Sequence, residues 1–431
     1  MPGTVSFLFD FSCPFAYLAS TAIEAVAAQA GAELRVRPFL LGGVFRARGV
    51  AQNLAGTLNP AKAAHNLSDM HRGARAFGVP FAMPAGHPLR TVTALRVLLA
   101  HNRALADGDA EAEEQGRAML PLMHRLYRAY WVDGVDISDA ARLRALLEDE
   151  GLDADGLLAA AATQPIKDEL HRRTDEAIEL GVFGAPALVV RGRGPFGDED
   201  ERDWLYWGQD RLHFVEQALG AEPQVVPSAH EGPPVDVWFD YGSPFGYLGV
   251  SRARAVLGDR VRWRPMLLGA IFKQLGGPLV PIRTFHAAKQ RWVADDLRWQ
   301  ARGAEIPMQW PSGFPVRTVL ALRVTLLALQ DDPAAGERLI HRLFRLVWVE
   351  DADPADPQLV ARCCDEVGLD GASLVAQAGE PAGKQALFAS TAAALEAGVF
   401  GAPTFVVDPD GEEPALYWGN DRLPLLARGI R

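Results

Sequence analysis

Two short stretches of this chain, Phe9–Leu18 and Phe239–Leu248, place a cysteine or a serine directly before a proline. Each stretch follows an apolar run typical of a buried strand and leads into a pattern that predicts a helix. Because proline is favoured at the first position of a helix, Cys13 and Ser243 are expected at helix N-termini. Unpaired backbone N–H groups and the positive end of the helix dipole meet there. The anion that such a position could stabilise is a thiolate, either that of Cys13 or that of a ligand.

A plainer interpretation of these two residues remains open, in which Ser243 is an ordinary N-cap and Cys13 a small buried residue. The helix N-terminus is expected to lower the pKa of Cys13 from about 8.5 toward roughly 3.5 to 7.5, so we expect Cys13 to be a reactive thiol. Cys363 and Cys364 lie within the helical pattern Leu359–Val367 and are expected to be inert packing residues.

Internal repetition organises the whole chain. Four further blocks recur in the same order, at Arg37–Gly42 and Arg264–Gly269, Arg90–Val97 and Arg317–Val324, Gly181–Pro186 and Gly398–Pro403, and Tyr206–Leu212 and Tyr417–Leu423. The sequence therefore predicts a tandem duplication, with the first repeat at residues 1–220 and the second at 235–431. Residues 221–234, rich in Pro, Ala and Glu, form the expected linker.

Each repeat shows the element order of a thioredoxin-like domain with an inserted helical domain. In the first repeat the predicted strands and helices occupy residues 5–9, 14–30, 33–39, a helical region at about 58–180, then 186–191, 204–207 and 210–219. The first three make a right-handed βαβ unit, and the last three a ββα unit. The corresponding insertion in the second repeat is expected at about 284–397. The predicted fold class is α/β, with two such domains in tandem.

The sequence Gly-Val-Phe-Gly-Ala-Pro ends the inserted region of both repeats. In thioredoxin-like folds the turn at this place holds a cis proline that faces the active helix. A cis X–Pro bond is rare, so the repetition favours cis bonds at Pro186 and Pro403. The alternative is an ordinary trans proline at the start of a strand.

Taken together, the motifs Ser/Cys-Pro-Phe-x-Tyr-Leu, Arg-Pro-x-Leu-Leu-Gly, Gly-Val-Phe-Gly-Ala-Pro and Trp-Gly-Gln/Asn-Asp-Arg-Leu give a specific resemblance. The chain resembles the 2-hydroxychromene-2-carboxylate isomerase family, whose relatives include the kappa-class glutathione transferases of the DsbA-like thioredoxin group. The resemblance covers nearly all of both repeats and omits the linker. It implies a glutathione-dependent isomerase of aromatic degradation, which adds a glutathione thiolate reversibly to an unsaturated, aromatic-derived substrate.

The resemblance also implies which residues contact glutathione. Ser243 matches the family serine that lies against the sulfur, and Cys13 replaces it in the first repeat. The remaining implied contacts are Phe183, Ala185, Pro186, Asp210 and Arg211, Phe400, Ala402, Pro403, Asp421 and Arg422, and Lys62, Asp69, Lys289 and Asp296 in the inserted helices. The Asp-Arg pairs are expected at the γ-glutamyl end, because arginine suits a carboxylate and aspartate an ammonium.

Two departures from the family pattern distinguish the repeats. Arg298 continues the family's Asp-Leu-Arg-Trp pattern in the second repeat, whereas His71 stands there in the first. The family's asparagine upstream of the lysine has two candidates in the first repeat, Asn53 and Asn59. The second repeat has no asparagine between Gly269 and Lys289.

Composition narrows the choice of function. A net charge of −11 argues against a nucleic-acid or membrane-surface partner. The sequence has neither Cys-x-x-Cys nor a metal-ligand spacing of histidines, and its three cysteines suit a reducing cytoplasm. We expect a monomer whose two repeats pair as an intramolecular pseudo-dimer, in the way that two subunits of a relative would.

Three alternative functions stay open. The first is a kappa-like glutathione transferase. The second is a monothiol oxidoreductase that uses Cys13, which has Ala16 and not a resolving thiol at the third position after it. The third is a glutathione-binding protein without turnover.

Overall fold

The computed structural model describes residues 3–53, 55–197, 202–222 and 226–430. The chain divides into two compact units, the first made of Met1–Leu58, Met70–Gln224 and His286–Trp292 and the second of Asn59–Asp69, Val225–Phe285 and Val293–Arg431. The units follow the two sequence repeats except at two short segments. Asn59–Asp69 belongs to the second unit, and His286–Trp292 to the first.

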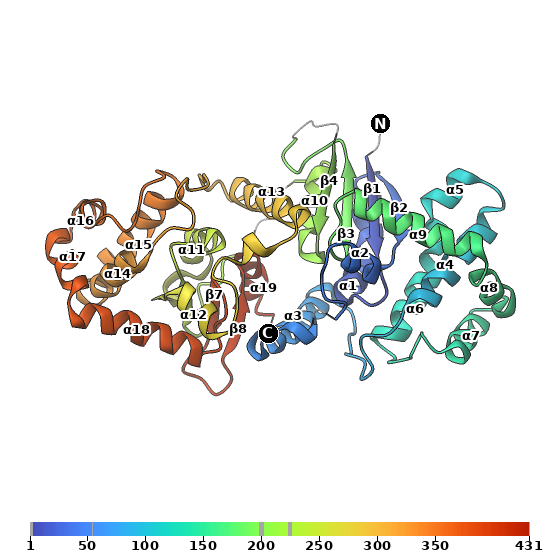
Figure 1. The fold of residues 1–431 in the computed structure, drawn as a ribbon, viewed down its shortest axis with the longest axis horizontal. Coiled ribbons are helices and arrows are strands. Elements are labelled where there is room, and N and C mark those ends of the chain that lie inside the picture. Colours follow the sequence, from blue (N-terminus) through green and yellow to red (C-terminus); the bar gives the residue numbers. More distant parts are fainter. Residues whose placement is uncertain (1–2, 54, 198–201, 223–225, 431) are drawn as a thin grey trace. The chain divides into compact units, whose positions relative to one another are not determined.

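The first unit is built on a four-stranded sheet of order β2-β1-β3-β4 (Figure 1). Its strands are β1 (Thr4–Phe9), β2 (Glu33–Pro38), β3 (Ala187–Arg191) and β4 (Asp203–Trp207). β1 and β2 are parallel and joined by α1 (Pro14–Gln29), whereas β3 and β4 are antiparallel to their neighbours. Val5 pairs with Leu34 on one side and Val190 on the other. The predicted βαβ and ββα units are therefore present, close to the predicted bounds.

Helices fill the sequence between the two halves of this sheet. They are α2 (Leu41–Ala47), α3 (Pro60–Phe77), α4 (Val92–Ala106), α5 (Ala110–Gln115), α6 (Leu120–Trp131), α7 (Ala140–Asp149), α8 (Ala154–Ala161) and α9 (Gln164–Glu179), and α10 (Leu212–Ala218) follows β4. Asp109, Asp139 and Asp153 cap α5, α7 and α8 by accepting backbone N–H bonds, which sets where these helices begin.

The core of the first unit joins the helical insertion to the loop that follows β1. Phe9, Phe11, Tyr127 and Trp131 are completely buried, and the rings of Phe11 and Tyr127 lie 4.9 Å apart edge to face. The indole nitrogen of Trp131 donates a hydrogen bond to the carbonyl oxygen of Phe11 at 2.9 Å. Such large aromatic side chains dominate the energy of burial, so α6 fixes the loop that leads to Cys13.

The second unit repeats this architecture. Its sheet has the order β6-β5-β7-β8, from β5 (Val235–Phe239), β6 (Val261–Pro265), β7 (Thr404–Val407) and β8 (Ala415–Trp418). Its helices are α11 (Pro244–Leu257), α12 (Leu268–Gln274), α13 (Ala287–Gly303), α14 (Val319–Asp331), α15 (Pro333–Trp348), α16 (Pro357–Glu366), α17 (Gly371–Gly379), α18 (Pro381–Glu396) and α19 (Leu423–Ala427). The same anchor recurs, since the indole of Trp348 donates to the carbonyl of Tyr241 at 2.8 Å.

The predicted cis bonds are present at Ala185–Pro186 and Ala402–Pro403. Two further cis bonds, His87–Pro88 and Phe314–Pro315, were not predicted. Across the described part of the chain, the helices all fall short of the length and apolar character needed to span a bilayer.

Candidate active sites

A buried aspartate holds the loop before each candidate residue. In the first unit, Asp10 accepts hydrogen bonds from the backbone and hydroxyl of Ser12, from the amide of Leu41 at 2.9 Å and from the hydroxyl of Thr91 at 2.6 Å. Burial raises the pKa of Asp10, and these hydrogen bonds oppose the rise. One carboxylate thus ties together the loop after β1, the start of α2 and the start of α4.

Asp240 plays the same part in the second unit. Its carboxylate accepts from the amides of Gly242 at 2.9 Å and Leu268 at 2.8 Å, and from the side chain of Thr318. Burial raises its pKa as well. The sequence analysis did not single out these two aspartates, although both copies of the ten-residue stretch contain them.

Cys13 is the N-cap residue of α1, as predicted. Its thiol is 8% exposed and donates to the carbonyl oxygen of Ala185, the residue before the cis proline, at 3.0 Å. Burial raises the pKa of this thiol to about 12, more than the backbone N–H groups of Phe15 and Ala16 lower it. The expected low pKa is therefore wrong, because a thiol enclosed among apolar groups favours its neutral form.

Ser243 occupies the same position in α11 with one more hydrogen bond. Its hydroxyl donates to the carbonyl oxygen of Ala402 at 3.1 Å and accepts from the amide of Gly246 at 3.0 Å. Among the described residues, Cys13 shows no such side-chain cap on its own helix. The hydroxyl of Ser243 is therefore held at the helix N-terminus from both sides, beside the turn that contains Pro403.

The segment before each cis proline packs against the tryptophan of the Trp-Gly motif. The rings of Phe183 and Trp207 lie 5.0 Å apart, as do those of Phe400 and Trp418. A side chain on Gly184 would overlap with the indole nitrogen of Trp207. Only glycine therefore lets the backbone approach the indole at this point, which accounts for the Phe-Gly-Ala-Pro motif.

The segment His286–Trp292, which belongs to the first unit, packs against Phe183 and Trp207. The ammonium group of Lys289 lies 5.0 Å from the ring centre of Trp207 and 5.8 Å from that of Phe183. The ring of Trp292 lies 5.3 Å from Trp207, nearly perpendicular to it. Lys289, from the second repeat of the sequence, therefore packs against the aromatic pair of the first, because a cation is attracted to the face of an indole.

The second unit receives the segment Asn59–Asp69 in the same way. Lys62 lies 4.9 Å from the ring centre of Trp418, and burial lowers the pKa of its ammonium group. Three residues further on, His65 packs edge to face against Phe400, and its Nε2 accepts a hydrogen bond from the amide of Trp418 at 3.1 Å. Histidine thus stands in the second unit where Trp292 stands in the first.

A buried ion pair continues this site. Arg422 Nε lies 2.9 and 3.1 Å from the two carboxylate oxygens of Asp69, whose side chain is only 5% exposed. Arg422 also lies 3.4 Å from Asp421. Sequence reasoning named all three residues but treated Asp69 as part of the first repeat, whereas the fold places it against the motif of the second.

The Asp-Arg pair of the first unit is similarly enclosed. Arg211 is 5% exposed, lies 3.2 Å from Asp210, and has its guanidinium 5.8 Å from the ring centre of Trp292. In the second unit, the completely buried Asp296 accepts from Gln300, which in turn accepts from Asn420 at 2.6 Å. Asp296 therefore supports the Trp-Gly-Asn-Asp-Arg motif through Gln300.

The residues at which the two repeats depart from the family pattern make contacts close to them in the sequence. Asn53 accepts from the amide of Gly56, and Asn59 accepts from the amide of Lys62 at 2.9 Å, which makes both local turn residues. Arg298 lies 3.1 Å from Asp295, and His71 packs against Phe81.

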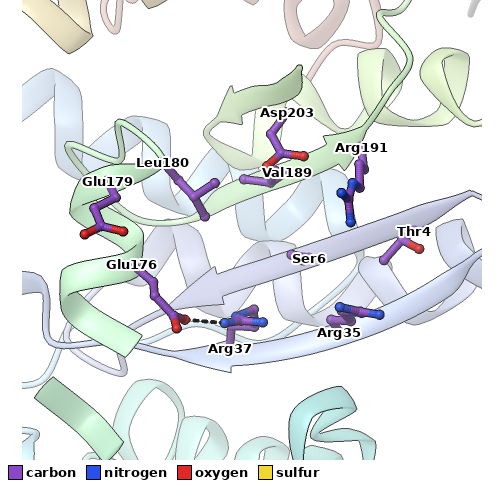
Figure 2. Close-up of a pocket in the computed structure, with 10 residues that line it drawn as sticks. All are labelled: Thr4, Ser6, Arg35, Arg37, Glu176, Glu179, Leu180, Val189, Arg191 and Asp203. Atoms are coloured by element: carbon purple, nitrogen blue, oxygen red, sulfur yellow. Dashed lines mark hydrogen bonds and ion pairs between the residues drawn. The ribbon is translucent and has the colours of Figure 1, made fainter. Parts of the chain in front are cut away.

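A separate hollow of about 390 Å³ lies in the first unit at the start of β1 (Figure 2). It is lined by Thr4, Ser6, Arg35, Arg37, Glu176, Glu179, Leu180, Val189, Arg191 and Asp203. Cys13 follows the other end of β1, so the hollow is not the predicted site. Within the described ranges, no cluster of three or more His, Cys, Asp or Glu residues could hold a metal ion.

The sheet order and the paired cis-proline turns define a thioredoxin fold with an inserted helical domain. The chain belongs to the DSBA-like thioredoxin domain family, whose model matches residues 4–220 and 234–431. It is therefore a tandem duplication of that domain.

Curated relatives match one repeat length of this chain. It is 28% identical to the 2-hydroxychromene-2-carboxylate isomerase of Sphingobium xenophagum over 225 residues, which cover 51% of this chain and 99% of the relative. It is 26% identical to glutathione S-transferase kappa 1 of Rattus norvegicus over 220 residues, 48% of this chain and 92% of that protein. A solved 2-hydroxychromene-2-carboxylate isomerase aligns with a TM-score of 0.39 and 23% identity, covering 50% of this chain and 94% of that one.

Proposed function

We propose that this chain is a glutathione-dependent isomerase of the 2-hydroxychromene-2-carboxylate isomerase type, and that the second site does most of the work. The observation that carries the proposal is the hydroxyl of Ser243, held at the N-terminus of α11 beside the carbonyl of Ala402. A thiolate placed there would meet the positive end of the helix dipole, and the hydroxyl of Ser243 would turn its proton from Ala402 to the sulfur. The names of the relatives support glutathione and this type of substrate.

The charges around Trp418 complement those of glutathione, which carries two carboxylates and one ammonium. Lys62 and Arg422 would take the carboxylates, and Asp421 would take the ammonium group. Asp69 would keep Arg422 in place, since their buried pair fixes the guanidinium. The backbone beside Pro403 would hold the cysteinyl part, with the sulfur directed at Ser243. Phe183, Ala185, Pro186, Asp210, Arg211 and Lys289 would play the matching parts in the first unit.

The proposed reaction is a reversible addition and elimination without net oxidation. The glutathione thiolate forms a C–S bond with the carbon β to the carbonyl of the ring-opened substrate, and the electron pair of the C=C bond moves onto the carbonyl oxygen as an enolate. Rotation about the new single bond follows. The enolate then re-forms the double bond and expels the thiolate, which leaves glutathione unchanged. Ser243 would lower the energy of the thiolate in both steps.

Ser243→Ala tests this proposal against Cys13→Ser as its matched control. We expect Ser243→Ala to lower kcat for glutathione-dependent isomerisation of 2-hydroxychromene-2-carboxylate by about 10- to 1000-fold, the scale of one lost transition-state hydrogen bond. Glutathione affinity, measured by calorimetry, should change little. Cys13→Ser should keep or raise activity. Full activity in Ser243→Ala together with loss in Cys13→Ser would assign the reaction to the first repeat.

A kappa-like transferase is the nearest alternative, because it would use the same bound thiolate and keep the adduct. Product analysis separates the two: an isomerase returns all glutathione, and a transferase consumes one per turnover. Cys13 chemistry of the oxidoreductase kind is disfavoured by the raised pKa of its buried thiol. We further propose that the protein works as a monomer in the cytoplasm, where glutathione is reduced, and that its repeats act as an intramolecular pseudo-dimer.

A further inference from the structure

The hollow at the start of β1 lies on one face of the sheet of the first unit (Figure 2). Side chains alternate along a strand, so Thr4 and Ser6 point to this same face. Ser6 pairs with Arg35 on β2 and with Val189 on β3, which places those two side chains beside its hydroxyl. The C-terminal end of α9 lies over the same face. None of these residues belongs to the proposed glutathione sites.

The hollow is lined by equal numbers of arginines and carboxylates, which are not all paired with one another. Arg37 and Glu176 form an ion pair, which satisfies both (Figure 2). Arg191 and Asp203 lie directly opposite each other on β3 and β4. Among the residues that the structure describes, neither of these two side chains forms an ion pair or a side-chain hydrogen bond, and the same holds for Glu179. One guanidinium and two carboxylates therefore face the hollow with their hydrogen-bonding capacity unused.

This arrangement of charges favours a ligand that carries both signs. A carboxylate would accept hydrogen bonds from Arg191 and from the hydroxyls of Thr4 and Ser6. An ammonium group would donate to Asp203 and Glu179. A simple anion would be repelled by the two carboxylates, and a simple cation by the guanidinium. The lining therefore fits a zwitterion better than an ion of either sign.

The remaining part of the lining is apolar. Leu180 and Val189 border the hollow, and Val189 is buried in the sheet. The volume of about 390 Å³ lies within the range of about 300–1,000 Å³ that small-molecule sites occupy. An apolar group attached to the zwitterion would contact these two residues. An amino acid with a branched apolar side chain combines all of these features.

The second repeat has replaced two of the residues that make up this lining. Asp408 stands at the place of Arg191 after the cis proline, and Asp236 stands at the place of Ser6. Asp236 lies 3.0 Å from Arg264, so a carboxylate of the chain itself pairs with an arginine of this sheet face. Because a carboxylate replaces the unpaired guanidinium, the two repeats cannot bind the same ligand at this point of the sheet.

We propose that the hollow of the first unit is a binding site for a free amino acid with a branched apolar side chain, held by its carboxylate at Arg191 and by its ammonium group at Asp203. The site is separate from that of Cys13, which follows the opposite end of β1. The inference does not depend on glutathione or on the proposed isomerase reaction.

The test is equilibrium dialysis of the full chain with ¹⁴C-labelled L-valine at low ionic strength, where exposed charges are least screened. Two competitors each lack one charge: 3-methylbutanoate lacks the ammonium group, and isobutylamine lacks the carboxylate. We expect saturable binding of L-valine. Each competitor should bind about 10- to 100-fold more weakly, because a hydrogen bond to a charged group contributes this much. The absence of saturable binding, or equal affinity for L-valine and either competitor, would overturn the proposal.

Two substitutions locate the binding in the hollow. Arg191→Asp should weaken L-valine by about 10- to 100-fold without weakening isobutylamine, and Asp203→Asn should weaken L-valine without weakening 3-methylbutanoate. These selective losses exclude misfolding, which would weaken all three probes. The matched control is Arg193→Asp, the same charge change at an exposed arginine outside the hollow, which should leave L-valine affinity unchanged. Equal losses in Arg191→Asp and Arg193→Asp would place the binding elsewhere and overturn the proposal.

Discussion

The two repeats share the buried aspartate that anchors the active loop and differ in the group that the loop presents. In the second unit, Ser243 both caps its helix and donates to the carbonyl before Pro403. In the first, Cys13 makes only the corresponding donation, to Ala185. The surroundings differ as well: His65 stands beside Trp418 where Trp292 stands beside Trp207. Conservation of a backbone position therefore does not conserve its chemistry, which depends on a single side-chain atom and its burial.

The largest expected effect concerns Cys13. With a pKa near 12, its thiolate fraction at pH 7 is about 3000-fold below that of a free thiol with a pKa of about 8.5. We expect iodoacetamide labelling of Cys13 to be slower by that factor and to rise about tenfold per pH unit from pH 7 to 10. The Cys363→Ser/Cys364→Ser background isolates the signal. A labelling rate that stays constant above neutral pH would show that the pKa of Cys13 is lowered, as the sequence predicted.

The next effect tests whether a helix of one repeat serves the site of the other. Asp69→Asn should weaken glutathione binding at the second site by about 100-fold, because it leaves Arg422 with a broken buried pair. The matched control is Asp168→Asn, an exposed carboxylate of α9 in the first unit. Calorimetry in an Arg211→Ala background, which removes a proposed glutathione contact of the first site, measures the second site, and an Arg422→Ala background measures the first. A loss confined to the first site would contradict the assignment of Asn59–Asp69 to the second unit.

The smallest expected effect comes from exchanging the N-cap residues of the two repeats. Cys13→Ser supplies the hydroxyl that can accept from the first turn of α1, as Ser243 does from Gly246. An added N-cap of this kind stabilises a helix by about 1 kcal/mol. We expect a slightly higher free energy of unfolding in urea for Cys13→Ser and a slightly lower one for Ser243→Cys. A lower free energy of unfolding for Cys13→Ser, or a higher one for Ser243→Cys, would contradict this prediction.

Local sequence patterns were enough to predict the fold and the backbone around each candidate site. The apolar run before Phe9, the helix-starting Pro14 and the repeated Gly-Val-Phe-Gly-Ala-Pro are local signals, and each corresponds to the predicted strand, helix start or cis bond. Periodicity and proline placement express short-range physics, which a sequence displays directly.

The features that the sequence did not reveal depend on contacts between distant residues. The pKa of Cys13 is raised by burial in the folded domain, where its thiol contacts Ala185, 172 positions away in the chain. The pairing of Asp69 with Arg422 spans 353 positions. The Asp-Arg motif occurs in both repeats, and the spacing of residues within it does not indicate which copy will contact Asp69.

The assignment of Asn59–Asp69 to the second unit has a consequence for how the duplicated gene can change. In an ordinary duplication, a copy whose active residue is lost becomes free to accumulate mutations. Here the first copy supplies Lys62, His65 and Asp69 to the second unit, so selection on the activity proposed for that unit would still act on the first copy. A replacement such as cysteine at position 13 can persist while the helix a few dozen residues later stays under constraint. In each unit, the residue before the helix and the lysine-bearing segment packed near it come from different repeats, so the two can change independently in evolution.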